Sequence, residues 1–195
     1  LGGGALECQS LVKRFGSYAE HAYATSSADA RAFAYFDTSE ILSGAYYVRL
    51  YVRFASLPGT HGDFANFVCV YDASPYRSLI WRVNLCYITD RCYLEMYAPR
   101  SSSGFLYYDF SDINTTKWYV VEFGYSKHAT QGFYRIYVDG MLEASYENKN
   151  TSSDPNAVDF RFGLIGGRGT WSNGLPDLYI DRVVIDTNYI GPAPL

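Results

Sequence analysis

The chain of 195 residues has little positive charge, little sulfur and no long apolar run. Sixteen basic residues stand against twenty acidic ones, and the net charge at pH 7 is -4. Nucleic-acid binding needs basic side chains clustered on one face, whereas here they are scattered, so we expect no nucleic-acid partner. No apolar stretch approaches the roughly 20 residues of a membrane-spanning helix, so we expect no membrane insertion.

Lysine and methionine are the scarcest of the common long side chains. Only four of the sixteen basic residues are lysine, and arginine suits planar hydrogen bonding with carboxylates or sugar hydroxyls. Two methionines stand against 20 tyrosines and 12 phenylalanines, a balance that favours strands over helices. With 48% hydrophobic residues, residues 1–195 are expected to form a single domain, excised or processed from a longer chain because it starts at Leu1 without a signal-like segment.

The segment from Trp118 to Ser145 shows the β character most clearly. Alternation between apolar and polar residues over 118–126 and 132–138 has the period of two that a strand requires. The second run ends in Asp139-Gly140, a dipeptide that readily adopts the positive φ angles of a two-residue hairpin turn. The segment therefore predicts two consecutive hairpins.

Strand-like runs recur along the whole chain, with polar or glycine-containing turns between them. Roughly a dozen strands in one domain indicate two stacked sheets or a barrel, and no helix longer than two turns is expected. The predicted strands are 5–12, 18–24, 31–37, 45–55, 64–72, 78–88, 92–98, 105–110, 118–126, 132–138, 141–147, 157–165 and 178–186.

Four segments carry a resemblance to a known superfamily: YYVRLYVRFASLPG (46–59), KWYVVEFGY (117–125), FYRIYVDGMLEAS (133–145) and YIDRVVIDTNYIGP (179–192). Together they resemble the concanavalin A-like lectin and glucanase superfamily, in particular its laminin-G-like jelly-roll domains. The resemblance implies an all-β fold, a two-sheet antiparallel jelly-roll sandwich. It also implies a concave sheet on which relatives bind or cleave sugars.

Catalytic motifs of that superfamily are missing from the sequence. Its glycosidases place two carboxylates on one strand face, typically within an E-x-D-x-x-E run, and no such run occurs. Its alginate lyases need an arginine-rich strand, which Arg49 and Arg53 mimic, but also a Gln-x-His pair, which is missing. The three histidines lack ligand spacing for zinc and show no Ser-His-Asp pattern. We therefore predict a binding domain rather than an enzyme.

Polar and aromatic residues alternate with apolar ones on several predicted strands. If these strands share the concave sheet, they form a groove of aromatic rings and hydrogen-bonding groups, the combination that sugars prefer. The alternative is a solvated sheet face whose side chains pair with one another. The predicted carbohydrate-binding residues here are Tyr47, Arg49, Tyr51, Arg53, Arg82, Asn84, Tyr93, Glu95 and Tyr97.

A second candidate ligand contact is Trp171, which stands among small residues in the loop 166–176. It is expected either to contact a ligand or to fold back on the sandwich. A structural calcium ion is the one cofactor considered, with Asp177 and Asp181 as ligands, although they form no recognisable loop motif. A glycan or polysaccharide is the expected partner. The alternative is a structural or adhesion role, with a second copy or a neighbouring surface protein as the partner.

The four cysteines and two glycosylation sequons point to an extracellular location. Cys86 and Cys92 flank a predicted three-residue loop centred on Thr89, which would place them opposite each other within disulfide reach. Cys8 and Cys69 are then left as a second pair by elimination. The sequons begin at Asn114 and Asn150, both in polar segments between strands. Buried thiols and chance sequons are the alternative.

Overall fold

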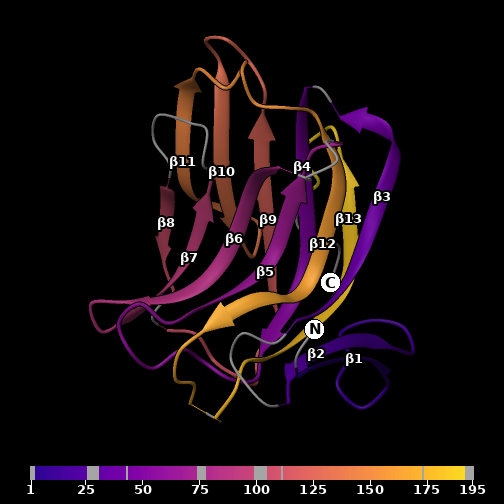
Figure 1. Cartoon of the computed structure of the whole chain (residues 1–195), viewed down its shortest axis with the longest axis vertical. Coiled ribbons are helices and arrows are strands. Elements are labelled where there is room, and N and C mark those ends of the chain that lie inside the picture. The colour runs from indigo at the N-terminus through magenta and orange to yellow at the C-terminus, as the bar shows by residue number, and fades with distance from the viewer. Residues whose placement is uncertain are drawn as a thin grey trace.

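The computed structural model describes residues 3–25, 31–42, 44–73, 78–98, 105–110, 112–172 and 174–191. This part of the chain contains thirteen strands and no helix, arranged as two antiparallel sheets packed face to face (Figure 1). Seven strands pair in the order β1 (Gly4–Gln9), β2 (Ala19–Ala24), β13 (Asp177–Asp186), β4 (Ala45–Phe54), β9 (Tyr119–Ser126), β10 (Gly132–Val138) and β11 (Met141–Lys149). Six pair in the order β3 (Ala32–Leu42), β12 (Ala157–Arg168), β5 (Phe64–Tyr71), β6 (Leu79–Ile88), β7 (Arg91–Tyr97) and β8 (Phe105–Asp109).

All thirteen predicted strands are confirmed, as is the two-sheet antiparallel sandwich. The alternation in β9 has its predicted consequence: Tyr119, Val121, Phe123 and Tyr125 are buried in the core between the sheets. Asp139 and Gly140 have φ angles of +50° and +86°, which confirms the tight turn between β10 and β11. Local pattern therefore determines both the strands and the side of the sheet that each side chain occupies.

A hydrogen bond crosses the core between the two sheets. The indole Nε1–H of Trp81 on β6 donates to the hydroxyl of Tyr46 on β4 over 2.8 Å, and both side chains are fully buried. The Tyr46 ring also lies close to the rings of Trp81, Tyr125 and Phe160. The bond gives the buried indole N–H of Trp81 its hydrogen-bond partner.

Tyr46→Phe is expected to lower the free energy of unfolding by about 1 to 3 kcal/mol, because it leaves the indole N–H buried without an acceptor. Denaturant unfolding followed by tryptophan fluorescence measures this loss. Tyr46→Phe combined with Trp81→Phe removes both partners. If the hydrogen bond matters, the two changes together cost less than the sum of the single changes; strict additivity would contradict it.

The hairpin of β6 and β7 corrects the prediction of a Cys86–Cys92 disulfide. Its loop has two residues, Thr89 and Asp90, with φ angles of +48° and +65°. Cys86 therefore lies opposite Tyr93, and Cys92 lies opposite Tyr87. A shift of one residue moves a side chain to the other face of a sheet. Cys92 consequently points into the core and Cys86 out of it, so the two thiols lie on opposite sides.

The second predicted pair is not formed either. Cys8 lies exposed on β1 at the edge of the seven-stranded sheet, while Cys69 is buried on β5 in the interior of the six-stranded sheet. All four cysteines are free thiols. Burial raises the pKa of the Cys69 thiol to about 12, which keeps it protonated and unreactive at neutral pH.

Candidate functional site

The predicted carbohydrate-binding residues are divided between the two sheets. Those on β4 belong to the seven-stranded sheet, and those on β6 and β7 belong to the six-stranded sheet. Because the alternate residues of all these strands point into the shared core, the two polar faces point away from each other. The condition for a single groove, that the strands share one sheet, is not met.

The polar face of the seven-stranded sheet is covered by the end of the described chain, the C-terminal strap of residues 187–191. The Arg49 guanidinium donates to the Gly191 carbonyl oxygen over 2.6 Å. The Glu122 carboxylate accepts the backbone N–H groups of Ile190 and Gly191 at 2.9 and 3.1 Å. The Tyr189 ring packs edge-on against Tyr47. Arg49 and Tyr47 are thereby buried by the chain itself.

The remaining predicted residues on β4 also have partners within the chain. The Phe15 ring of the N-terminal loop packs edge-on against Tyr51, with ring centroids 4.7 Å apart. Arg53 donates to the Thr115 carbonyl oxygen. Asp181 anchors the loop by accepting the backbone N–H groups of Arg14 and Phe15. For this sheet the alternative of side chains paired with one another describes the structure.

The outer face of the six-stranded sheet carries two adjacent rows of polar and aromatic residues, which we call the rowed face. Strand register aligns both rows across five strands, β12, β5, β6, β7 and β8. The first row is Arg161, Cys69, Arg82, Tyr97 and Phe105. The second row is Gly166, Asn66, Asn84, Glu95 and Tyr107. Neighbouring strands are about 4.8 Å apart, so each row is about 19 Å long.

An aromatic platform lies at the β8 end of the rowed face. Phe105 stacks on Tyr97 with centroids 4.6 Å apart, and it lies nearly parallel to Tyr107 at 5.8 Å. Phe105 and Tyr107 are 42% and 43% exposed. Burial raises the pKa of the Tyr107 hydroxyl, which is also hydrogen-bonded to Glu95 and stays protonated. These exposed rings offer flat surfaces to the C–H faces of a sugar.

Hydrogen-bonding groups without partners lie beside the platform. Asn84 is 2% exposed; its amide nitrogen donates to Glu95 over 2.6 Å, but its oxygen Oδ1 has no partner. Asn66, directly opposite Asn84, also has a buried Oδ1 without a partner. The Nε of Arg82 is likewise buried without a hydrogen bond. A buried polar atom without a hydrogen bond costs about 1 to 3 kcal/mol. A ligand rich in hydroxyl groups would supply the missing partners.

A pocket of about 200 Å³ lies toward the β12 end of the rowed face. Its lining includes Asn66 and three arginines, Arg31, Arg82 and Arg161. The Arg161 guanidinium is paired with the buried Asp159 over 2.8 Å and lies 4.3 Å from the centroid of the Tyr71 ring. The rowed face is therefore aromatic at one end and cationic at the other.

Sequence reasoning missed half of this face. Asn66, Tyr71, Phe105, Tyr107 and Arg161 were all within predicted strands, but the strand order that joins them to β6 and β7 was unknown. Their alternation with core residues was the available signal. Trp171 was predicted as a ligand contact or as folding back, and it folds back: it is 4% exposed and bridges to Pro58, which corrects its assignment as a binding residue.

Asp177 and Asp181, the predicted calcium ligands, have other partners. Asp177 pairs with the Nε2 atom of His21 at 2.8 Å, and Asp181 holds the N-terminal loop. Within the described ranges, no three residues of the types His, Cys, Asp and Glu come together as a metal site. Calcium binding stays a prediction.

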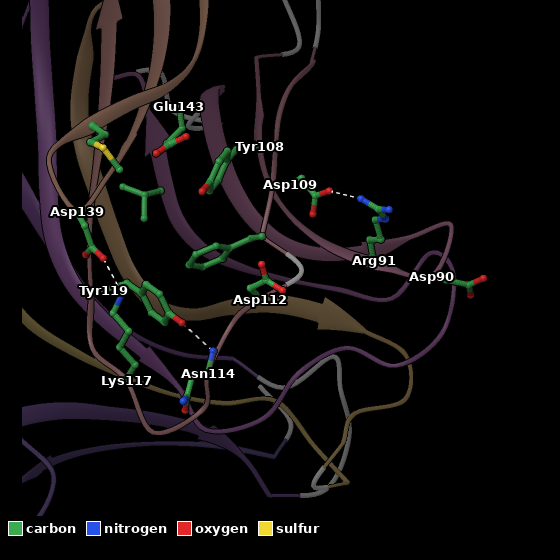
Figure 2. A pocket seen from close by; sticks show the side chains of 13 residues that line it. Asp90, Arg91, Tyr108, Asp109, Asp112, Asn114, Lys117, Tyr119, Asp139 and Glu143 are labelled. Atoms are coloured by element: carbon green, nitrogen blue, oxygen red, sulfur yellow. Dashed lines mark hydrogen bonds and ion pairs between the residues drawn. The ribbon is translucent and has the colours of Figure 1, made fainter.

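A second cavity, of about 680 Å³, lies near the edge strands β8 and β11 (Figure 2). Tyr108 and Tyr119 point into it, with Asp112 and Glu143 at its rim. Two of its carboxylates are neutralised, Asp109 by Arg91 and Asp139 by Lys117. Among its described lining residues, none has a buried side-chain atom without a hydrogen bond. The rowed face thus has the stronger demand for a ligand.

No protein-family model and no curated protein sequence matches this chain. Solved structures do match its fold. Cellulose-induced protein Cip1 is 16% identical with a TM-score of 0.70, over 98% of this chain and 89% of its own. The PL7 alginate lyase AlyA1 from Zobellia galactanivorans is 11% identical with a TM-score of 0.55, over 88% of this chain and 80% of its own.

The binding domain of botulinum neurotoxin serotype D/C is 14% identical with a TM-score of 0.60. The match covers 96% of this chain but 44% of the toxin chain, so the present chain spans less than half its length. At such identities the likeness shows the fold alone. That fold is the concanavalin A-like jelly roll that the sequence resemblance implied.

Proposed function

We propose that this protein is a carbohydrate-binding domain that holds a polysaccharide along the rowed face of its six-stranded sheet. The observation that carries the proposal is the combination of an exposed aromatic platform with three buried polar atoms that lack hydrogen bonds. The rings stack on the apolar faces of sugars, while the two unpartnered amide oxygens and the unpartnered guanidinium nitrogen form hydrogen bonds with sugar hydroxyls. The structural neighbours give general support, since one is a lyase of alginate and another a toxin binding domain.

Phe105→Ala is expected to weaken polysaccharide binding about tenfold, because one stacking contact contributes roughly 1 to 1.5 kcal/mol. Isothermal titration against a panel of plant, fungal and algal polysaccharides measures it. Phe36→Ala is the matched control: Phe36 is also exposed, but it lies on β3 on the other side of the same sheet. Equal losses in both variants, or no binding to any polysaccharide by the unmodified protein, would refute the proposal.

A polysaccharide lyase is a second candidate, favoured by the alginate lyase neighbour. Against it, the three histidines, His21, His61 and His128, lie on β2 and in loops, away from the rowed face. Incubation with acidic polysaccharides tests it directly, since a lyase releases chains with unsaturated ends. A structural or adhesion role predicts instead concentration-dependent self-association without polysaccharide binding.

An extracellular location is part of the proposal. Both sequon asparagines, Asn114 and Asn150, are exposed, and each side chain accepts hydrogen bonds from the residue two positions later. Glycosylation at either site therefore meets no steric barrier from the core. Within the described residues, no helix has the length and apolar character that a membrane span requires.

A further inference from the structure

We infer that the pocket at the β12 end of the rowed face takes a negatively charged oxygen group of the bound sugar, a carboxylate or a sulfate ester, so that the ligand is an acidic polysaccharide. This inference rests on the proposed function and adds the chemical class of the ligand.

The pocket is cationic in a protein that is acidic overall. Three arginines, Arg31, Arg82 and Arg161, line it, and none of its lining residues in the described part of the chain is Asp or Glu. The nearby carboxylate of Asp159 neutralises one of them. The net charge of the chain is -4, so the excess of positive charge here is local rather than general. A local field of this kind attracts anionic ligands.

Arg82 is the guanidinium with the greatest need of a partner. It lies between the rings of Tyr97 and Phe64, 4.8 and 6.0 Å from their centroids, which fixes its plane. Its Nε is buried without a hydrogen bond, and no carboxylate of the described residues forms an ion pair with it. An oxyanion would meet it through charge-assisted hydrogen bonds, which are stronger than neutral ones.

Arg161, which lines the same pocket as Arg82, has one guanidinium nitrogen available for a further hydrogen bond. Asp159 accepts from its Nε and Nη2 atoms, which leaves Nη1 for another acceptor. The ring of Tyr71 lies under the guanidinium and that of Phe33 lies 5.3 Å from it, so its orientation is held by packing. Arg161 and Arg82 belong to one row, separated by Cys69, and both line the same pocket. Two guanidinium groups in one pocket suit the oxygens of a carboxylate or sulfate ester.

Asn66 indicates that the anion belongs to a sugar. Its unpartnered Oδ1 is an acceptor and would repel a free anion, whereas a hydroxyl group donates to it. Asn84, its neighbour across the strands, presents a second such acceptor. The ligand that satisfies all these atoms therefore carries both an anionic group and hydroxyl groups. The row continues to Phe105, which provides a stacking surface for the other sugar units of the polysaccharide.

The test compares polysaccharides that differ in charge alone: polygalacturonate with its carboxyl-reduced form, and dextran sulfate with dextran. The unmodified protein is expected to bind at least one charged member about tenfold or more tightly than its neutral partner in 0.15 M salt. Which pair shows the preference identifies carboxylate or sulfate. Inorganic sulfate alone is expected not to compete at millimolar concentration.

Arg82→Gln should reduce the preference for the charged member to within about twofold, and Phe105→Ala should weaken both members of a pair equally. Arg82 forms no ion pair with the described carboxylates, so the variant is expected to fold. Its thermal unfolding, compared with that of the unmodified protein, checks this. Equal affinity for charged and neutral members would overturn the inference and leave the proposed function standing. Binding to a neutral polysaccharide of the panel, without binding to either charged probe, would also overturn the inference alone. Absence of binding to any polysaccharide tested would overturn both.

Discussion

Replacing Gly169 with alanine is expected to lower the free energy of unfolding by about 3 kcal/mol or more. Gly169 follows β12 with a φ of +107°, a conformation that L residues rarely adopt. An added Cβ would overlap the carboxylate of Asp63, which is buried and cannot withdraw. That carboxylate accepts the backbone N–H groups of Thr60 and Thr170 at 2.9 Å each, and so ties two loops together.

Gly174→Ala is the matched control for this change. Gly174 has a similar φ of +92°, but no atom lies within 4 Å of the position its Cβ would occupy. Gly174→Ala should therefore lower the free energy of unfolding only by the strain of the backbone conformation, about 1 kcal/mol. Urea unfolding of the two variants separates backbone strain from overlap with Asp63. Equal losses in both would show that the Asp63 contact contributes nothing.

Glu20→Gln is expected to stabilise the protein at pH 8 by about 3 kcal/mol and to have little effect at pH 4. Glu20 lies on β2 and points to the core side of the sheet, opposite Ile180. Its Oε1 is buried without a hydrogen bond, beside an apolar cavity of about 350 Å³ lined by residues that include Phe162 and Ile185. Burial raises the pKa of this carboxyl from 4.5 to about 7.

The Glu20 carboxyl ionises at a lower pH in the unfolded chain than in the folded protein. Below pH 4.5 the carboxyl is protonated in both, so it contributes no difference in stability. Between pH 4.5 and about 7 the unfolded chain ionises while the folded protein holds its proton, so the native state loses stability as pH rises. Glutamine never ionises. The difference between variant and unmodified protein should therefore grow over this interval and level off above pH 7.

Glu122→Gln provides a contrast with the same chemical change. The Glu122 carboxylate accepts two backbone N–H groups from the C-terminal strap, so an amide would turn its N–H₂ group toward a donor. This variant is expected to be less stable than the unmodified protein at pH 8, by about 1 to 2 kcal/mol. Unfolding free energies from pH 4 to 8 test both. A flat difference for Glu20→Gln would contradict its raised pKa.

Local sequence pattern predicted the strands because alternation and turn residues act over a few positions. The same pattern placed Val48, Leu50 and Val52 in the core, and Trp81 and Val83 opposite them. It could not decide which strands are neighbours, since that depends on long connections. β4 and β6 look alike as sequences, yet they lie in different sheets and their polar faces point in opposite directions.

Whether each polar face is covered or open depends on segments that are remote in the sequence. Arg49 and Arg82 are both arginines on alternating strands, but the strap covers Arg49 and accepts its hydrogen bond at Gly191, whereas Arg82 lines the pocket of the rowed face. No local signal distinguishes them. The Cys86–Cys92 error has a smaller cause: a hairpin loop of two residues rather than three reverses the face of one cysteine.

The distribution of basic residues has a practical consequence for measuring binding. All four lysines, Lys13, Lys117, Lys127 and Lys149, lie outside the strands of the six-stranded sheet, whereas the basic residues of the rowed face are arginines. Reagents directed at primary amines, whether they attach a dye, biotin or a sensor chip, will react away from the rowed face. A protein immobilised in this way presents that face to the solution, so surface-based assays report on it without an engineered tag.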